Sequence, residues 1–535
     1  MKVEQTNDVQ MNRFMKAFRS ETSFVRRYFE YEWTDQSFHD RARYLSERTY
    51  DRETLAETIR NYMKPYGWSE AIERHIESLR NDAYVVVGGQ QAGIAGGPLL
   101  SLHKALTVLL EAKKQSAELS HPVVPLFWIA GEDHDLEEIN HTYVKRKGRV
   151  QKMAYEETTA LKVSASQFVY TKEEMERYVK QLFQTFPETE HTKSLVQEAL
   201  SHVREGETYT DLFTRVMMSW TKEHGLLFID AADEAFRQME KEAFVQMIDR
   251  NEQMSKRVVA TERAFAKEGY GTPLEAIEES AHLFYVHETG RLLLKREGDR
   301  FYYEPLQLEW TADELKQLAR TTPERLSNDV VTRPLMQEMM LPVLAFVGGN
   351  GELAYWSLLK GAFQSLDLQM PIVMPRISTT LVTRPVEYAL RETGMTANEA
   401  LTANVSDEEQ RLLRQYEDET FVREIRTLEQ LMEQQYERIR QAAPESLARV
   451  VEKNEERQRK ELAFLHRSNE KMLKERHDVI FRRLNEWATD LQPNGHLQER
   501  TFSSYQYFNM YGPTLLDDLL TICYDESSAH HIVYC

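Results

Sequence analysis

Two cysteines, Cys523 and Cys535, are all that this chain of 535 residues contains, too few for a framework of disulfides. Long apolar runs are also missing. None approaches the roughly 18 residues of a membrane-spanning helix, and the opening segment MKVEQTNDVQMNRF lacks the apolar core of a signal peptide. Basic residues are outnumbered, because the net charge at pH 7 is −19. These deficits predict a cytoplasmic protein that binds neither nucleic acid nor a membrane surface.

Motifs that identify common enzyme classes are absent as well. Neither of the usual phosphate-binding loops, GxGxxG and GxxxxGK[ST], occurs in the chain, which argues against a dinucleotide-dependent dehydrogenase and a P-loop kinase. The GxSxG turn of serine hydrolases does not occur either. Both cysteines stand in the C-terminal tail with no base near them in the sequence, so we do not expect a cysteine nucleophile.

An alternation of short apolar runs with helical patterns begins near residue 83. Such alternation is typical of βαβ units around a mostly parallel sheet. The expected strands cover residues 83–87, 123–130, 226–230, 343–347 and 371–375. The expected helices cover residues 99–116, 233–251 and 352–366. The pattern therefore predicts the α/β fold class.

A chain of this length exceeds one ordinary core, so we divide it into several parts. Residues 1–80 form a helical segment that packs on the core, and residues 81–400 form the α/β core itself. Two inserts, at about 142–224 and 270–333, interrupt the core, and the turns of the second predict an antiparallel meander. We expect both inserts to decorate the sheet rather than extend it. Residues 492–535 form a tail that packs back on the core.

Residues 401–491 predict a long helical hairpin with a break near residues 442–444. In its second half, apolar positions recur every eleven residues, or about 3.7 residues per turn, which favours straight helix packing. Part of the apolar stripe stays uncovered in such an arm, which favours self-association. Polar residues within the stripe also permit a solvated, monomeric arm.

A glycine-rich loop follows the first expected strand, in the stretch AYVVVGGQQAGIAGGPLLSLHK. Glycine lets backbone amides approach a ligand, and the N-terminus of the next helix attracts anions, so the loop suits a phosphate or carboxylate. A sharp strand-to-helix turn would explain the same glycines. The candidate binding residues in this stretch are Gly88, Gly89, Gln90, Gln91, Gly93, Gly96, His103 and Lys104.

Carboxylates and imidazoles crowd the segment after the second expected strand, GEDHDLEEINH. A carboxylate beside an imidazole suits general-base work, because each shifts the pKa of the other. The cluster could also bind a divalent ion, and magnesium or no metal is favoured over zinc because the His and Cys spacing of zinc sites is missing. We assign no residue as a metal ligand. An acidic run at a solvated helix start is the alternative. The predicted catalytic residues are Asp133, His134, Asp135 and His141, and the predicted binding residues are Glu132 and Asn140.

Two further strand ends carry polar side chains. The stretch GGNGELAYW after the fourth expected strand supplies Asn350, Glu352 and Tyr355, and Arg376 follows the fifth. Arginine suits bidentate binding of a carboxylate or phosphate, and a surface ion pair is the alternative. Because ligands bind outside the carboxyl ends of strands in an open α/β sheet, we expect these loops to share one ligand site.

Five segments resemble, in order, the successive landmarks of the bacillithiol biosynthesis protein C family. They are GGQQAGIAGGPLLSLHK, PLFWIAGEDHDLEEINH, LSNDVVTRPLMQEMMLPVLAFVGGNGELAYWSLL, MPRISTTLV and QERTFSSYQYFNMYGP. The resemblance extends from residue 83 to the C-terminus. It implies a Rossmann-like core related to nucleotidyltransferases, with connecting-peptide inserts, a long antiparallel coiled-coil arm and a homodimer.

The resemblance also implies an activity, the joining of the carboxyl group of cysteine to the amine of glucosaminyl-malate. Amide formation from a free carboxylate is uphill, so ATP would activate the carboxyl group as an acyl-adenylate or an acyl-phosphate. In that chemistry, His103 and Lys104 would offset the charge of phosphates. Asp133 or His134 would accept the proton of the attacking ammonium.

The remaining candidates receive supporting roles from the same resemblance. Asp135 and His141 would orient the base, and Arg376 would bind a malate carboxylate. The residues with side chains suited to sugar hydroxyls or the cysteine ammonium are Gln90, Gln91, Asn350 and Glu352.

Two alternatives from other functional classes stay open. The chain could be a nucleotide-binding scaffold that bridges partners through its helical arm, with the acidic cluster serving structure. A metal-dependent hydrolase is disfavoured, because the cluster lacks a second set of ligands. Alanine replacement of Asp133 and His134 separates the enzyme from the scaffold.

Overall fold

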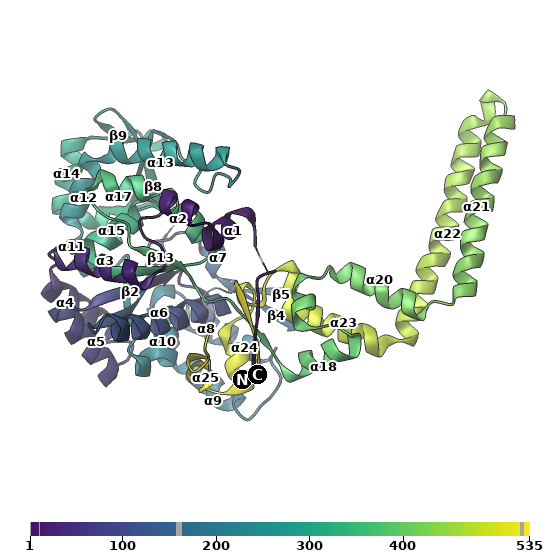
Figure 1. Ribbon diagram of the computed structural model, residues 1–535, viewed down its shortest axis with the longest axis horizontal. Helices are drawn as coiled ribbons and strands as arrows, with labels where there is room; N and C mark the ends of the chain where they lie inside the picture. The colour runs from purple at the N-terminus through teal and green to yellow at the C-terminus, as the bar shows by residue number, and fades with distance from the viewer. Residues whose placement is uncertain (1, 10, 157–162, 525–528) are drawn as a thin grey trace. The chain divides into compact units, whose positions relative to one another are not determined.

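The computed structural model describes residues 2–9, 11–156, 163–524 and 529–535 (Figure 1). The chain forms two compact units. The first comprises Met1–Thr380 with Gln498–Val533, and the second comprises Leu381–Leu497 with Tyr534–Cys535. The second unit therefore begins before residue 401, where we expected the arm to start.

A five-stranded parallel sheet forms the centre of the first unit, in the order β13-β12-β2-β3-β6. Its strands are β2 (Tyr84–Gln90), β3 (Val123–Ile129), β6 (Leu227–Asp230), β12 (Val343–Gly348) and β13 (Ile372–Pro375). Every predicted strand is present. Buried apolar runs mark strands that are covered on both faces, which is why the sequence reveals them.

Numbered along the chain, the strands of this sheet lie in the order 3-2-1-4-5 from β6 to β13. This is the strand order of Rossmann-type folds, in which the direction of winding reverses between the first and fourth strands. That reversal lies between β2 and β12, which pair in parallel. The geometry predicts a ligand crevice at the carboxyl ends of these two strands.

Helices pack along the strands of the parallel sheet. Helix α6 (Leu99–Glu118) contacts β2, β3 and β12. The N-terminal segment supplies α1 (Arg13–Ser20), α2 (Thr22–Tyr28), α3 (Asp35–Ser46), α4 (Arg52–Met63) and α5 (Glu70–Asn81). Of these, α3, α4 and α5 contact sheet strands, and Phe14 of α1 packs on Phe265 with ring centroids 5.8 Å apart. One strand, β1 (Lys2–Thr6), precedes these helices and was not predicted.

Two predicted helices are divided in the structure. The expected helix 233–251 is two helices, α11 (Glu234–Met239) and α12 (Lys241–Asp249), and α13 (Asn251–Lys267) begins where the expected helix ends. The expected helix 352–366 is two, α16 (Asn350–Trp356) and α17 (Lys360–Ser365). Neither proline nor glycine marks the breaks at Glu240, Arg250 and Ser357, so the apolar period continues across them.

The first insert begins with the hairpin of β4 (His141–Arg146) and β5 (Arg149–Ala154). It continues with α8 (Lys172–Phe183), α9 (Thr192–Ser201) and α10 (Tyr209–Thr221). Helix α10 starts at a capping box, in which Thr208 and Asp211 satisfy each other's backbone amides.

The second insert is the predicted antiparallel meander, with strand order β10-β9-β8-β7-β11. Its strands are β7 (Ser280–His287), β8 (Gly290–Glu297), β9 (Arg300–Tyr303), β10 (Leu308–Thr311) and β11 (Leu326–Asn328), with α14 (Ala312–Thr321) before β11. Strand β11 leads through α15 (Thr332–Met340) into β12. The insert therefore enters the parallel sheet beside the winding reversal.

The chain passes from the first unit into the second at β14 (Thr379–Val382). The second unit contains α18 (Arg384–Thr393), α19 (Ala397–Thr402), α20 (Val405–Tyr416), α21 (Glu419–Ala442), α22 (Ala448–Arg476) and α23 (Asp478–Leu491). Helices α21 and α22 pack as a hairpin, linked by His466 Nε2 and Glu429 Oε1 at 3.0 Å. The predicted break before Ala448 is confirmed, and a second break occurs at His477.

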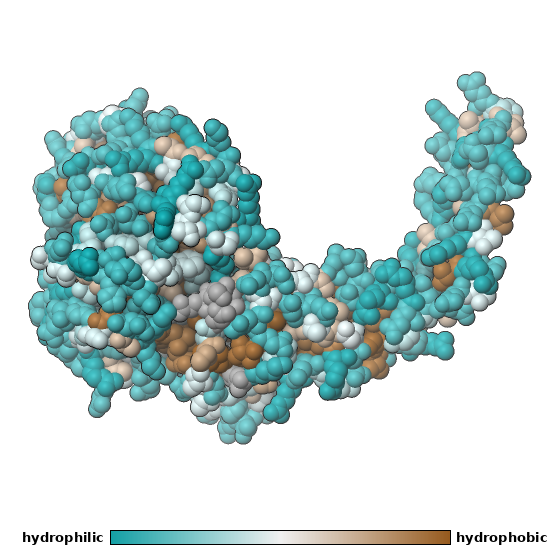
Figure 2. All heavy atoms as spheres, in the orientation of Figure 1, coloured by the Kyte–Doolittle hydropathy of each residue, from teal (hydrophilic) through white to brown (hydrophobic). Residues whose placement is uncertain are grey.

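Apolar side chains remain exposed along the hairpin of α21 and α22. Figure 2 shows them scattered over a largely hydrophilic surface. They include Leu428, Leu431, Ile439, Val450, Phe464 and Met472. Self-association stays a prediction.

The tail returns to the first unit through α24 (Ser504–Tyr511), α25 (Leu515–Leu520) and β15 (His530–Tyr534). Helix α25 contacts α6, and Phe508 stacks on Trp220 with ring centroids 4.9 Å apart. Among the helices that the structure describes, none is long and apolar enough to cross a membrane.

Candidate active site

A cavity of about 760 Å³ lies at the winding reversal of the parallel sheet. Three strand ends supply one wall of it. Gly89, Gln90 and Gln91 come from the end of β2, the segment from Ala130 to His134 follows β3, and Glu352 follows β12. The predicted meeting of these loops at one ligand-sized space is therefore present in the structure.

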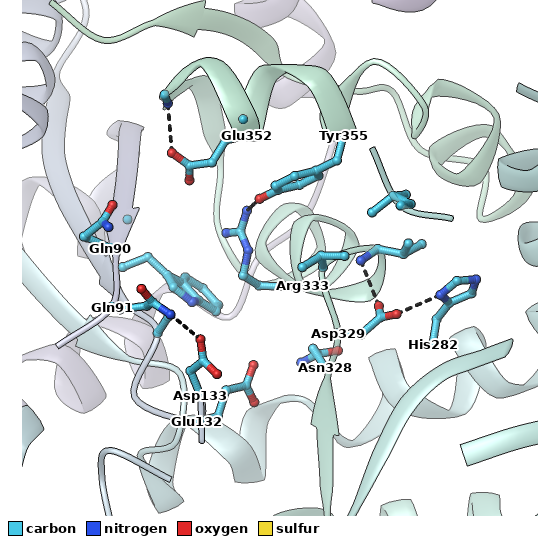
Figure 3. Close-up of a pocket in the computed structure, with 18 of the residues that line it drawn as sticks. Gln90, Gln91, Glu132, Asp133, His282, Asn328, Asp329, Arg333, Glu352 and Tyr355 are labelled. Carbon is cyan, nitrogen blue, oxygen red and sulfur yellow. Dashed lines mark hydrogen bonds and ion pairs between the residues drawn. The ribbon is translucent and has the colours of Figure 1, made fainter. Parts of the chain in front are cut away.

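The second insert supplies the opposite wall of this cavity. His282 and Arg291 come from the meander, Asn328 and Asp329 lie at the end of β11, and Arg333 belongs to α15. Figure 3 labels four of these residues, His282, Asn328, Asp329 and Arg333. The insert forms a sheet of its own and does not extend the parallel sheet, as we expected. Because β11 leads directly into α15 and β12, the meander also lines the cavity, which we did not expect.

Lys104 of α6 reaches the cavity from beneath the end of β2. Its ammonium donates to the carbonyl of Gly89, to Gln90 Oε1 at 3.2 Å and to Glu352. The side chain is only 1% exposed, and burial lowers the pKa of its ammonium, while Glu352 opposes that shift. Glu352 also accepts from the amide of Gly349 at 2.8 Å. Lys104 thus forms an ion pair with Glu352 that joins the carboxyl ends of the first and fourth strands.

The acidic segment after β3 is held from both sides. Gln91 Nε2 donates to Asp133 at 2.7 Å and to Glu138 at 2.9 Å, which ties the loop after β2 to the loop after β3 (Figure 3). Glu132 accepts from the buried guanidinium of Arg237 at 2.8 Å. These contacts leave Asp133 at the cavity surface, beside Glu132 and His134.

His134 lies on the same wall and approaches the insert. Its Nδ1 is 3.5 Å from Arg291 Nη1, and its ring lies edge-on to Phe284 with centroids 6.1 Å apart. Asp133 and His134 therefore line one space with Lys104, as the prediction of a shared site requires.

The glycines of the first loop mostly serve close packing rather than ligand contact. A Cβ atom on Gly88 would lie 2.7 Å from Val108 Cγ2, and one on Gly96 would lie 2.5 Å from Trp220. A Cβ on Gly93 would lie 2.7 Å from the Cα of Gly97. Gly89 alone of the predicted glycines lines the cavity. The loop after Gln91 is a tight turn, and the first amide of α6 donates to Phe502 O at 2.8 Å.

Other predicted site residues lie outside the cavity. His103 is buried and contacts Glu499 at 2.9 Å. Asp135 is exposed at the start of α7 (Leu136–Ile139), and His141 bonds the carbonyl of Glu137 at 3.0 Å. The carbonyl of Asn140 accepts from Tyr155 at 2.7 Å. Asn350 begins α16 without lining the cavity.

Arg376 borders the cavity, but its guanidinium is occupied. It donates from Nη1 and Nη2 to the two oxygens of Glu499, at 2.8 and 2.5 Å. Burial works against ionisation of Glu499, yet the charge and hydrogen bonds of Arg376 hold its pKa well below the usual range. We expected Arg376 to bind a substrate carboxylate or to form a surface pair. The structure instead gives it a buried partner from the tail, so it is not available as we predicted.

Two family models divide the chain between them. The description "Bacillithiol biosynthesis BshC, N-terminal Rossmann-like domain" matches residues 1–377, and "Bacillithiol biosynthesis BshC, C-terminal coiled-coil domain" matches residues 379–535. The chain belongs to the BshC family. The family resemblance and the Rossmann-like fold with a coiled-coil arm are thereby confirmed.

Curated relatives in the BshC family match the chain over nearly its whole length. A protein of Lysinibacillus sphaericus is 41% identical over 100% of both chains, and one of Geobacillus kaustophilus is 37% identical over 94% of this chain and 93% of its own. A Bacillus licheniformis protein is 33% identical over 98% of both. All three carry the name "Putative cysteine ligase BshC".

Sequence reasoning missed the insert-side residues of this BshC-family site. Asn328, Asp329 and Arg333 stand within the landmark LSNDVVTR, so the resemblance marked the segment without giving it a role. Asp329 accepts from His282 Nδ1 at 2.8 Å (Figure 3). His282 is 4% exposed, has a left-handed φ of +53°, and its Nε2 has no partner among the described residues. A non-glycine residue in that conformation is a feature that cannot be read from the sequence.

Among the described residues, no group of three or more His, Cys, Asp or Glu side chains is arranged to hold a metal ion. Three carboxylates of the cavity are engaged by protein donors. Glu132 is bonded by Arg237, Asp133 by Gln91, and Glu352 by Lys104.

Asp230 ends β6 beneath the loop after β3. Burial raises the pKa of this carboxyl group to about 7, although the amide of Ala232 and the hydroxyl of Ser166 act to lower it. A pKa raised above its unfolded value contributes stability that is present at low pH and is lost as the pH rises through about 7. Ionisation of Asp230 should therefore lower the free energy of unfolding at alkaline pH.

We expect Asp230→Asn to gain stability over the wild type as the pH rises. Between pH 5.5 and 8 the difference in unfolding free energy should move by about 2 kcal/mol in favour of the variant, because the amide cannot ionise. Urea unfolding at the two pH values measures the change. Asp313→Asn, at an exposed position, is the matched control. Its difference in unfolding free energy from the wild type should be the same at both pH values. A constant difference between Asp230→Asn and the wild type would contradict the buried, protonated state of Asp230.

Proposed function

We propose that the chain is a ligase that joins the carboxyl group of L-cysteine to the amine of glucosaminyl-malate, with consumption of ATP. The observation that carries this proposal is that one cavity holds Lys104 and the Asp133–His134 pair together. Its volume of about 760 Å³ suits small-molecule substrates. The relatives named as cysteine ligases support cysteine as one of them.

The reaction needs two steps, because a carboxylate does not acylate an amine directly. A carboxylate oxygen of cysteine attacks phosphorus of ATP, giving either an acyl-phosphate and ADP or an acyl-adenylate and pyrophosphate. The glucosamine nitrogen then attacks the acyl carbon, the amide C–N bond forms, and phosphate or AMP leaves with that carboxylate oxygen. The proton of the attacking ammonium passes to a base.

The cavity contains residues whose side chains suit each step of this reaction. The N–H groups of Lys104 are taken by Gly89, Gln90 and Glu352, so its ammonium would act on the transferred phosphorus group through its charge and not by a direct hydrogen bond. Asp133 or His134 would accept the ammonium proton, and Gln91 orients Asp133 through its 2.7 Å hydrogen bond. Magnesium would arrive on the phosphates of the nucleotide, where oxygen ligands already surround it.

We expect Lys104→Met to lower kcat for ligation by about 10²–10³-fold, because a positive charge aimed at developing negative charge is lost. Methionine fills the same buried volume, and circular dichroism and the melting temperature check that the fold is kept. The exposed Lys113→Met on the same helix is the control and should keep wild-type kcat. Unchanged kcat in Lys104→Met would exclude a role for this ammonium in the chemical step.

The proposed function is tested by incubating the purified wild-type chain with L-cysteine, glucosaminyl-malate, ATP and magnesium. Mass spectrometry should detect bacillithiol in an amount equal to the nucleotide consumed. ADP with phosphate would identify an acyl-phosphate, and AMP with pyrophosphate an acyl-adenylate. A chain that binds nucleotide yet forms no amide would be the scaffold rather than the ligase.

A further inference from the structure

Charges around the cavity are balanced in number but not in pairing. Five cations line it, Lys104, Arg291, Arg333, Arg376 and Arg500, and so do five carboxylates, Glu132, Asp133, Glu275, Asp329 and Glu352. Lys104 is paired with Glu352, and Arg376 with Glu499. No carboxylate of the described residues lies within 4.0 Å of the other three guanidinium groups. Among the described residues, these three guanidinium groups therefore have no ion pair, and of the carboxylates that line the cavity Asp133 and Glu275 have none either.

Arg291 of β8 is fixed in place by neutral groups alone. Its Nε donates to Ser327 Oγ at 3.0 Å, and its Nη2 donates to the backbone carbonyl of Asn328 at 2.7 Å. The guanidinium lies over Phe284, 4.1 Å from the ring centroid. Burial lowers the pKa of Arg291, while the more distant Glu132 and Asp133 act in the opposite direction. This cation is oriented and partly dehydrated without a counter-ion.

Arg333 of α15 is held in the same manner. Its Nη1 donates to Gln337 Oε1 at 3.0 Å, and its Nη2 donates to the hydroxyl of Tyr355 at 3.3 Å (Figure 3). The guanidinium lies 5.3 Å from the ring centroid of Phe346. Figure 3 shows the Arg333 side chain among the labelled residues, extending toward Tyr355.

A partly buried arginine without a carboxylate is costly, since it loses hydration and gains no ion pair. Neutral hydrogen-bond acceptors and an aromatic face fix its direction without neutralising it. Such an arginine keeps free N–H groups for an anionic ligand that enters the cavity, and its planar fork suits a carboxylate. The two arginines stand on different elements, β8 and α15, so each offers a separate anion position.

We propose that Arg291 and Arg333 form a dicarboxylate subsite, in which each guanidinium binds one carboxylate of the malyl group of the acceptor substrate. The subsite rests on the proposed function for the identity of its ligand. It takes the role that we first predicted for Arg376, whose guanidinium is held by Glu499. The insert wall therefore recognises the acid part of the acceptor, while the sheet wall carries Asp133 and Lys104 for the chemistry.

The test measures binding rather than turnover. Wild type, Arg291→Gln and Arg333→Gln are each titrated by calorimetry with glucosaminyl-malate and, separately, with ATP. Each substitution should raise the Kd for glucosaminyl-malate by about 10–100-fold, as expected for loss of a charged hydrogen-bond pair, and should change the Kd for ATP less than twofold. Arg300→Gln, an exposed arginine of the same antiparallel sheet, should leave both constants unchanged.

Two variants that keep the positive charge distinguish loss of binding from loss of the fold. Arg291→Lys and Arg333→Lys should recover part of the affinity, because lysine keeps the charge but not the fork. Unchanged binding of glucosaminyl-malate in both glutamine variants would overturn the subsite, as would a wild type that fails to bind it. Weakened binding of ATP alone would overturn it in favour of a phosphate site. Arginine-dependent binding by a wild type that forms no amide would instead refute the proposed function and keep the subsite.

Discussion

Replacing both Asp133 and His134 with alanine is expected to lower kcat for amide formation by about 10³-fold, because both side chains proposed to take the ammonium proton are then removed. Both residues line the cavity, and neither is fully buried. The fold should therefore survive the change. Steady-state assay of bacillithiol, with circular dichroism as a check on folding, measures the effect.

The matched control for this double variant is Glu137→Ala, an exposed residue of the short helix that follows the same loop. It should keep wild-type kcat. Single variants Asp133→Ala and His134→Ala show which group takes the proton, since the base should account for most of the loss. A double variant that works at the wild-type rate would remove the acid-base role from this loop.

Glu499→Ala is expected to give the largest loss of stability, about 3–5 kcal/mol, because it leaves a buried arginine without its counter-ion. Glu499 is 1% exposed. It accepts from Arg376, from His103 at 2.9 Å and from Ser378 Oγ at 2.9 Å. The carboxylate ties the returning tail to the strand ends beside the cavity. Urea unfolding followed by circular dichroism measures the change.

A double-mutant cycle shows whether the loss belongs to the pair. Glu499→Leu combined with Arg376→Met should be less destabilising than the sum of the single changes, because no charge is then buried alone. Glu456→Ala, which breaks an exposed pair with Lys460, should stay close to wild type. Additive effects of the two core substitutions would contradict an interaction between Arg376 and Glu499.

The parallel sheet could be predicted because its strands carry their own signal. Runs such as the one that forms β3 are apolar on both faces, and helical patterns separate them. The antiparallel order of the second insert followed from turn residues between alternating strands. Each of these signals lies within about ten residues of sequence, and hydrophobic periodicity predicts secondary structure over ranges of about this length.

The candidate site was predicted only on its sheet side, for a physical reason. Gln91, Asp133 and Glu352 follow strands whose carboxyl ends meet by the rules of the fold. Arg291 and Arg333 reach the same cavity only because the meander folds over it, and no local pattern encodes that placement. Arg376 lies 123 residues from Glu499 in the sequence. The sequence around an arginine after a strand does not show whether its guanidinium binds a substrate or a distant residue of the same chain.

The glycine loop is a second place where the sequence does not identify the contacting group. Glycine permits a close approach, but the sequence does not say what approaches. At Gly96 it is the ring of Trp220, and at Gly88 it is a methyl group of Val108. At Gly89 it is the carbonyl of Trp128, 2.6 Å from a Cβ placed there. The glycines expected to receive a ligand mainly let the loop pack against its own protein.

The most direct test of carboxyl activation uses L-cysteine labelled with oxygen-18 in both carboxylate oxygens. The purified wild-type chain is given this cysteine, glucosaminyl-malate, ATP and magnesium, and the products are analysed by mass spectrometry. One labelled oxygen should remain in the amide of bacillithiol, and the other should appear in phosphate or AMP. Absence of bacillithiol, or bacillithiol formed without label in either phosphate or AMP, would contradict the ligase mechanism.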